Sequence, residues 1–117
     1  MADADAFIRL ALSFPGASQH PHFDRTAFKA RVTFATLAPD RRSANLKLAP
    51  DEQALKCEVA PEAFSALANA WGARGWTQAL FAPLSETELQ AALALAYAHA
   101  APRPTRTRGL TAARRLR

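Results

Sequence analysis

Apolar positions near the start of the chain recur with helical spacing. They follow the pattern i, i+3, i+4 and i+7, which places them on one buried helical face. Asp3 or Asp5 can cap the N-terminus of this helix, and the Pro-Gly pair at 15–16 ends it. The positions on the predicted buried face are Phe7, Leu10, Ala11 and Phe14.

A second helix is predicted near residue 85, and its start is the best specified in the sequence. Ser85 and Glu88 have the spacing of a capping box, and Leu84 with Leu89 has that of a hydrophobic staple. The helix should stop by Ala101, because the proline that follows disfavours helical geometry in the residue before it. The predicted buried positions are Leu89, Leu93, Ala96, Tyr97 and Ala100.

Between these helices, residues 27–37 alternate between apolar and polar side chains, as a half-buried strand does. The segment is long for a single strand. It is therefore either one bent strand or a hairpin that turns near Arg31 and Val32. The inward set is Phe28, Ala30, Val32 and Phe34, and the outward set is Lys29, Arg31 and Thr33.

Two further strands are predicted, at residues 44–49 and 76–81. A turn containing Pro, Asp and Ser at residues 38–43 precedes the first of them. Residues 17–26 are polar and contain Pro21, so they form a loop or an edge strand, where a missing backbone donor is tolerated. The inward positions of the 44–49 strand are Leu46 and Leu48.

Short helices and one irregular segment complete the pattern. Residues 50–52, Pro-Asp-Glu, open a helix that carries Leu55 and Cys57, since Pro suits the first turn and acids suit its positive end. A brief helical turn is predicted at 61–67, and two glycines interrupt regular structure at 71–76. This order of elements predicts an α+β fold, a two-layer sandwich in which an antiparallel sheet has helices packed on one face.

The positive charge is concentrated at the C-terminal end. Residues 1–101 hold nine Lys or Arg and ten Asp or Glu, whereas residues 102–117 hold six Arg and no acid. We therefore expect one near-neutral domain over residues 1–101 and an Arg-rich tail that cannot bury a core and is disordered. The single cysteine excludes an intramolecular disulfide and fits a cytoplasmic protein. No apolar run approaches the roughly 18 residues of a membrane span.

Four short motifs occur in a characteristic order. They are Pro-His-Phe-Asp-Arg-Thr-Ala-Phe at 21–28, Phe-Ala-Thr-Leu at 34–37, Asn-Leu-Lys-Leu at 45–48 and Gly-Trp-Thr at 75–77. With them, residues 5–101 resemble the MmcQ/YjbR family of small bacterial proteins. The resemblance implies a two-layer fold similar to bacterial frataxin, a CyaY-like fold, and carries a suggestion of DNA binding through wing-like hairpins. The family pattern has a Gly-containing turn where Ala-Arg-Val-Thr stands at 30–33.

No pattern of reactive residues indicates catalysis. His20, His22 and Asp24 have an i, i+2, i+4 spacing that a transition metal can use, but a polar edge strand shows the same spacing and no further ligand is evident. Cys57 needs a nearby base to act as a nucleophile, and beside Leu55 it is better explained as a small core residue. We expect a non-enzymatic protein with no metal and no cofactor.

The remaining candidates bind rather than react. Arg74 lies between Trp71 and Trp76, and with Lys47 nearby it would form a patch that stacks a base and holds a phosphate. Alternatively, both tryptophans anchor the core. The sequence predicts weak nucleic-acid binding without sequence preference, carried mainly by the tail; the alternatives are a solubilising tail without a partner, and a ligand- or protein-binding adaptor that uses a groove near Trp71, Trp76 and Lys47. The tail arginines are Arg103, Arg106, Arg108, Arg114, Arg115 and Arg117.

Overall fold

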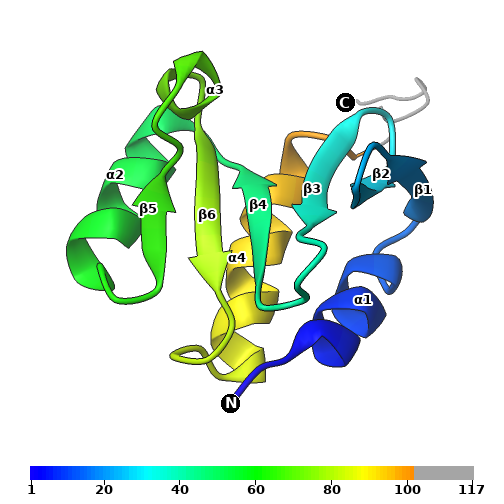
Figure 1. Ribbon diagram of the computed structural model, residues 1–117. Coiled ribbons are helices and arrows are strands. Elements are labelled where there is room, and N and C mark those ends of the chain that lie inside the picture. Colours follow the sequence, from blue (N-terminus) through cyan, green and yellow to red (C-terminus); the bar gives the residue numbers. More distant parts are fainter. Residues whose placement is uncertain (102–117) are drawn as a thin grey trace, which may run out of the picture.

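The computed structural model describes residues 1–101, which form a six-stranded antiparallel sheet and four helices (Figure 1). This confirms the predicted α+β class. The tail from 102 to 117, with its six arginines, lies outside the described residues. The helices are α1 (Ala4–Leu12), α2 (Pro50–Val59), α3 (Ala70–Ala73) and α4 (Glu86–Ala98), and the strands are β1 (Ser18–His22), β2 (Arg25–Lys29), β3 (Thr33–Leu37), β4 (Ser43–Lys47), β5 (Phe64–Ala66) and β6 (Trp76–Leu80).

The strands lie in the order β1-β2-β3-β4-β6-β5, and every neighbouring pair is antiparallel. The first four strands form a meander, and β6 returns to pair with β4 before β5 closes the other edge. Helices α1 and α4 pack together behind the sheet, while α2 lies beside β5 and α3 lies at the start of β6 (Figure 1). Among residues 1–101, no helix covers the opposite face of the central strands.

Aromatic rings fill the space between the sheet and the two long helices. The Phe7 ring of α1 meets the Phe28 ring edge-on at 5.2 Å between centroids, and lies 5.4 Å from the Phe81 ring. Phe14 stacks on Tyr97 of α4 at 4.6 Å. Phe34 of β3 meets the Phe14 and Tyr97 rings edge-on. Burial of one such side chain stabilises a fold by about 1.5–3 kcal/mol, so these contacts attach both helices to the sheet.

The predicted caps are present at both long helices. Asp3 caps α1, since its carboxylate accepts a hydrogen bond from the Ala6 N–H at 2.8 Å. At α4 both halves of the capping box form: the Ser85 hydroxyl accepts from the Glu88 N–H, and the Glu88 carboxylate accepts from the Ser85 N–H. Leu84 and Leu89, the staple pair, are both buried.

The segment 27–37 is a hairpin, which settles the alternative that the sequence left open. Strand β2 begins earlier than predicted, at Arg25, and residues 30–32 form the turn before β3. Val32 was expected to face inward, but it is 45% exposed because it belongs to that turn. The polar segment before it forms β1, an edge strand that contains Pro21.

Two other expectations are wrong. Residues 61–67 do not form a helical turn: Phe64–Ala66 is the edge strand β5, held by pairing with β6 and by burial of the Phe64 ring. The irregular segment 71–76 begins with a short helix, α3, whose N-terminus is capped by the Asn69 side chain. In α2, Leu55 is 59% exposed, whereas Cys57 packs against the core as predicted.

Candidate ligand-binding groove

A β-bulge shapes the uncovered face of the sheet. Lys29 of β2 pairs with Thr33 of β3, but the preceding Phe28 pairs with Ala35, so Phe34 is an extra residue in its strand. Such a bulge turns two consecutive side chains to the same face. Phe34 and Ala35 are accordingly both fully buried. Thr33 and the residue three positions later, Thr36, consequently both lie on the open face, which a regular strand would not allow.

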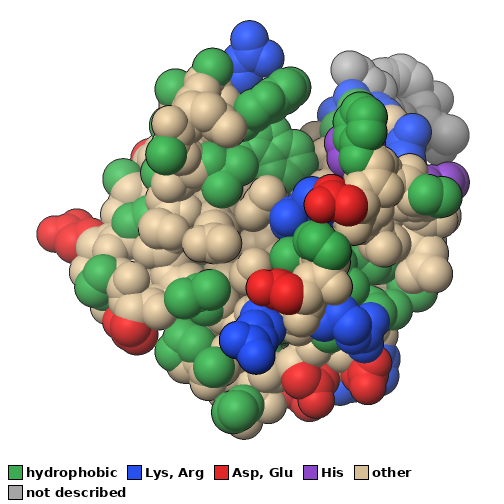
Figure 2. Space-filling view, viewed as in Figure 1, with side chains coloured by type: hydrophobic (Ala, Val, Ile, Leu, Met, Phe, Trp, Pro, Cys, Tyr) green, Lys and Arg blue, Asp and Glu red, His purple; other side chains and the backbone are tan. Residues whose placement is uncertain are grey.

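The open face is hollowed between α3 and the β1–β2 hairpin. The hollow has a volume of about 430 Å³, and Figure 2 shows it as a depression between two prominences, with apolar side chains on its floor. We call it the groove. Its lining residues are His22, Arg25, Thr33, Thr36, Asn45, Leu67, Asn69, Trp71 and Trp76.

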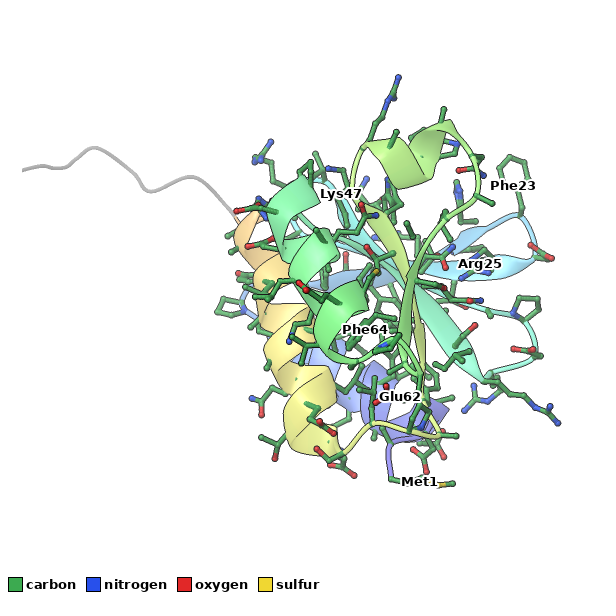
Figure 3. The ribbon with its side chains drawn as sticks, turned by 90° about the vertical axis from the view of Figure 1, so that its left-hand side faces the viewer. Met1, Phe23, Arg25, Lys47, Glu62 and Phe64 are labelled. Carbon is green, nitrogen blue, oxygen red and sulfur yellow. The ribbon has the colours of Figure 1, made fainter. Side chains whose placement is uncertain are left out.

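Arg25 is the cationic side chain that lines the groove. Its Nε donates to the Thr36 hydroxyl at 2.9 Å and its Nη2 donates to the Thr36 carbonyl at 3.2 Å. Figure 3 shows Arg25 on the side of the sheet away from α4. Within residues 1–101 the ion pairs involve other side chains, so Arg25 forms no direct salt bridge there. The two hydrogen bonds orient it and leave further N–H donors for an anion.

The charge of Arg25 persists despite partial burial. Burial lowers the pKa of its guanidinium, while the nearby carboxylates of Asp24 and Asp40 raise it. An arginine remains protonated at physiological pH in any protein environment. The groove therefore contains a permanent positive charge in partly desolvated surroundings, where an anion would be attracted more strongly than at an open surface.

Two glycines allow α3 to fold down as one wall of the groove. A Cβ at Gly72 would lie 1.8 Å from the Leu67 carbonyl oxygen, and one at Gly75 would lie 1.8 Å from the Leu48 carbonyl oxygen. The side chain of Gln53 in α2 ties the same segment down, because its amide donates to the carbonyls of Gly72 and Trp76. These contacts hold Trp71 and Trp76 at the groove.

The structure brings together most of the domain residues that the sequence singled out. Trp71 is 54% exposed and Trp76 half-buried, and neither belongs to the main core, so the core-anchor alternative does not describe them. The Arg74 guanidinium lies over the Trp71 ring, 5.3 Å from its centroid. Lys47 pairs directly with Trp76 across strands β4 and β6, although it does not line the hollow.

Sequence reasoning missed Arg25, Asn45 and Thr36 as groove residues. Thr36 and Asn45 lie on strands between apolar neighbours, whereas Arg25 stands between Asp24 and Thr26 in the Pro-His-Phe-Asp-Arg motif. A polar residue on the outward side of a strand does not by itself indicate a binding site, because the outward faces of strands are usually solvated. These residues can be recognised as a site only once the fold shows that none of the described helices covers this face.

The weaker chemical candidates remain separate from one another. His20 and His22 lie on β1, where the His20 ring contacts the Ser18 hydroxyl at 2.8 Å. Within residues 1–101 no three His, Cys, Asp or Glu side chains gather closely enough to hold a metal ion. No helix in the same part of the chain is long and apolar enough to cross a membrane.

Comparison with known proteins identifies the family. A model of the YjbR family matches residues 12–99. The chain belongs to the YjbR family. This YjbR chain is similar in fold to the crystal structure of the Deinococcus radiodurans protein DR2400, a DUF419 protein, with a TM-score of 0.70 at 15% identity, covering 83% of this chain and 77% of that one. At this identity the likeness establishes the fold alone. No curated protein sequence matches the chain.

Proposed function

We propose that this YjbR protein is a non-enzymatic, cytoplasmic binding protein with a frataxin-like fold. Its groove binds single-stranded nucleic acid with little sequence preference. One observation carries the proposal: two indoles and an arginine outside the described ion pairs line a single hollow on the uncovered face of the sheet. The frataxin-like assignment is supported by the order of elements, in which two terminal helices pack on one face of an antiparallel sheet.

The chemistry of the groove matches the repeating parts of a nucleic-acid strand. Every base has a flat π-face, so an exposed indole such as Trp71 stacks on any of them, and each stacked base contributes about 1–3 kcal/mol. The free N–H groups of Arg25 suit a phosphate oxygen. Lys47 and Arg74 add positive charge beside the two indoles. Stacking and phosphate contacts carry little base information, which explains the expected lack of sequence preference.

The tail supplies a second, purely electrostatic contribution in this proposal. The segment 102–117 contains six arginines and no acidic residue. Each phosphate contact to a single strand changes the slope of log K against log salt by about −0.7. If all six took part, they would account for a slope of up to about −4 by the same relation.

Titration of a labelled oligothymidine with the full chain tests the proposal, with anisotropy and tryptophan fluorescence as readouts. Trp71→Ala should weaken binding about ten-fold at every salt concentration, because it removes one stacked base without removing a charge. A chain that ends at Ala101 should instead flatten the salt dependence and keep the fluorescence change. The matched control is Val59→Ala, which removes a 72% exposed apolar side chain from α2.

Two results would contradict this assignment. If the tryptophan fluorescence of the wild-type protein does not change with any oligonucleotide at low salt, the groove is not a nucleic-acid-binding site. Equal affinity of the Trp71→Ala and Val59→Ala variants would do the same, since both lose an exposed apolar side chain but only Trp71 lines the groove.

A second candidate is a small-molecule or protein-binding adaptor that uses the same groove. The observation in its favour is the volume of the hollow, about 430 Å³, which falls in the range of about 300–1,000 Å³ common for small-ligand sites. A thermal-shift screen with mononucleotides, other metabolites and metal ions separates the two, since a ligand at one hundred times its Kd stabilises the fold by about 2.7 kcal/mol. Stabilisation by a metabolite without a base would favour this candidate.

A further inference from the structure

Phe23 occupies the tip of the β1–β2 hairpin in an unusual conformation. His22 pairs with Arg25, so Phe23 and Asp24 form a two-residue turn. The Phe23 side chain is 95% exposed, and its backbone φ is +58°. A positive φ is uncommon for any residue other than glycine, and for a bulky one it is an outlier.

The turn would favour glycine at this position. A positive φ at the first central residue, without one at the second, is the pattern of a type II′ hairpin turn, whose first central position prefers glycine. The Phe23 ring contributes little to the fold, because its aromatic contact is an edge-on approach to the His22 ring at 4.9 Å. The chain thus holds a large aromatic ring in water at a strained position, and such outliers concentrate at ligand contacts.

The hairpin tip adjoins the groove. His22 and Arg25, the residues on either side of the turn, both line the hollow. Figure 3 shows Phe23 and Arg25 on the same side of the sheet, with Phe23 farther out at the end of its hairpin. A strand that placed one base against Trp71 and a phosphate on Arg25 would therefore continue toward the Phe23 ring.

We propose that Phe23 is a second stacking position, which receives an unpaired base next to the one in the groove. The inference rests on the proposed nucleic-acid function and deepens it, because the ligand must then be single-stranded and at least two nucleotides long. Asp24, the acidic neighbour in the turn, disfavours a phosphate at the tip itself. The sugar-phosphate chain passes over Arg25, and the base meets Phe23.

Tryptophan fluorescence provides the test, since the chain contains two tryptophans and both line the groove. The full chain is titrated with thymidine monophosphate, with oligothymidines of two to eight nucleotides and with a duplex. Phe23→Ala should weaken oligonucleotide binding about ten-fold, the loss expected for one stacked base, and should leave mononucleotide binding unchanged. Phe23→Tyr should restore affinity, because it retains a flat ring.

Phe23→Gly separates binding from folding. Glycine removes the ring and also relieves the positive φ, so this variant should be at least as thermostable as the wild-type protein while it binds oligonucleotides as weakly as Phe23→Ala. A lower melting temperature for Phe23→Gly would overturn the proposal, because it would show that the ring serves the fold. Val59→Ala again serves as the matched control for loss of an exposed apolar group.

The outcomes distinguish this inference from the function on which it depends. If Trp71→Ala weakens oligonucleotide binding but Phe23→Ala matches the control, the groove binds nucleic acid and the Phe23 proposal is wrong. If no nucleotide changes the fluorescence, the proposed function fails and this inference falls with it. If Phe23→Ala weakens duplex binding as strongly as single-strand binding, or weakens binding to phosphatidylserine vesicles instead, the ring serves a different ligand and the proposal is overturned.

Discussion

Substitution of Gly75 by alanine should be among the most damaging single changes in the domain. Gly75 has a φ of +106°, and a Cβ there would lie 1.8 Å from the Leu48 carbonyl oxygen. Its own carbonyl accepts hydrogen bonds from the Leu48 N–H at 3.0 Å and from the Thr77 hydroxyl at 2.9 Å. Thr77 is completely buried, so any shift of this backbone leaves a buried hydroxyl without its acceptor.

The magnitude follows from two contributions. Strain of about 1–2 kcal/mol is expected for alanine with a positive φ, and a buried donor that loses its acceptor costs about 1–3 kcal/mol. Together they give a loss of roughly 3 kcal/mol in the free energy of unfolding. For a domain near 100 residues this corresponds to a fall in melting temperature of roughly 15 °C.

Urea and thermal denaturation of the full chain measure this loss. The matched control is Gly16→Ala, since Gly16 also has a positive φ, +79°, but is exposed beyond the end of α1. It should lose only the strain contribution, about 1–2 kcal/mol. Equal destabilisation by the two substitutions would refute the argument, because it would show that the overlap with Leu48 and the hydrogen bond of Thr77 contribute nothing.

Three further predictions concern the cap, acid stability and the groove. Ser85→Ala should destabilise the domain by about 1 kcal/mol in urea denaturation, because it removes the side-chain acceptor of the α4 capping box; unchanged stability would contradict the capping assignment. Burial raises the pKa of Glu52, but hydrogen bonds from the His99 ring and the Ala49 N–H outweigh it and hold the pKa below its ordinary 4.5. The ionised Glu52 carboxylate thus stabilises the folded state above pH 4.5, and this stabilisation is lost as the pH falls. The difference in melting temperature between the wild-type protein and Glu52→Gln should therefore become smaller in acid. A difference that stays constant with pH would contradict this role of Glu52. Arg25→Lys should weaken oligonucleotide binding without changing the slope of log K against log salt, whereas Arg25→Gln should reduce the magnitude of that slope by about 0.7. An unchanged slope in Arg25→Gln would show that Arg25 does not contact a phosphate.

The parts of the fold that depend on local chemistry were predictable. The caps of α1 and α4 follow from Asp3 and from the Ser85–Glu88 pair, because a cap needs only residues three positions apart. The strand at β4 follows from alternation around Leu46. These signals are confirmed because each involves neighbours in the sequence, whose geometry changes little when the rest of the chain packs.

The errors arise where distant contacts decide the structure. Phe64–Ala66 follows a proline and is short, so its local pattern favours a helical turn, yet it pairs with β6 and buries the Phe64 ring against the core. Val32 was expected to face inward, as alternation alone predicts, but it is 45% exposed. Residues 30–32 form a turn, and Arg31 is fixed by a hydrogen bond from its N–H to the Ala100 carbonyl, far away in the chain. Such tertiary contacts outweigh the local secondary-structure propensity of these residues.

The groove shows why a binding site was harder to predict than the elements that build it. Its indoles were visible as a Trp-Gly-Ala-Arg-Gly-Trp segment, but their partner Arg25 lies on β2, two strands beyond β4 in the sheet order. The two sides face one hollow because none of the helices in residues 1–101 covers this side of the sheet. In addition, the bulge at Phe34 turns Thr33 and Thr36 outward together. Thr36 then orients the Arg25 guanidinium. If Phe34 were paired as a regular strand residue, strict alternation would place Thr33 and Thr36 on opposite faces of β3. The groove therefore depends on a local irregularity in β3 that an alternation pattern does not reveal.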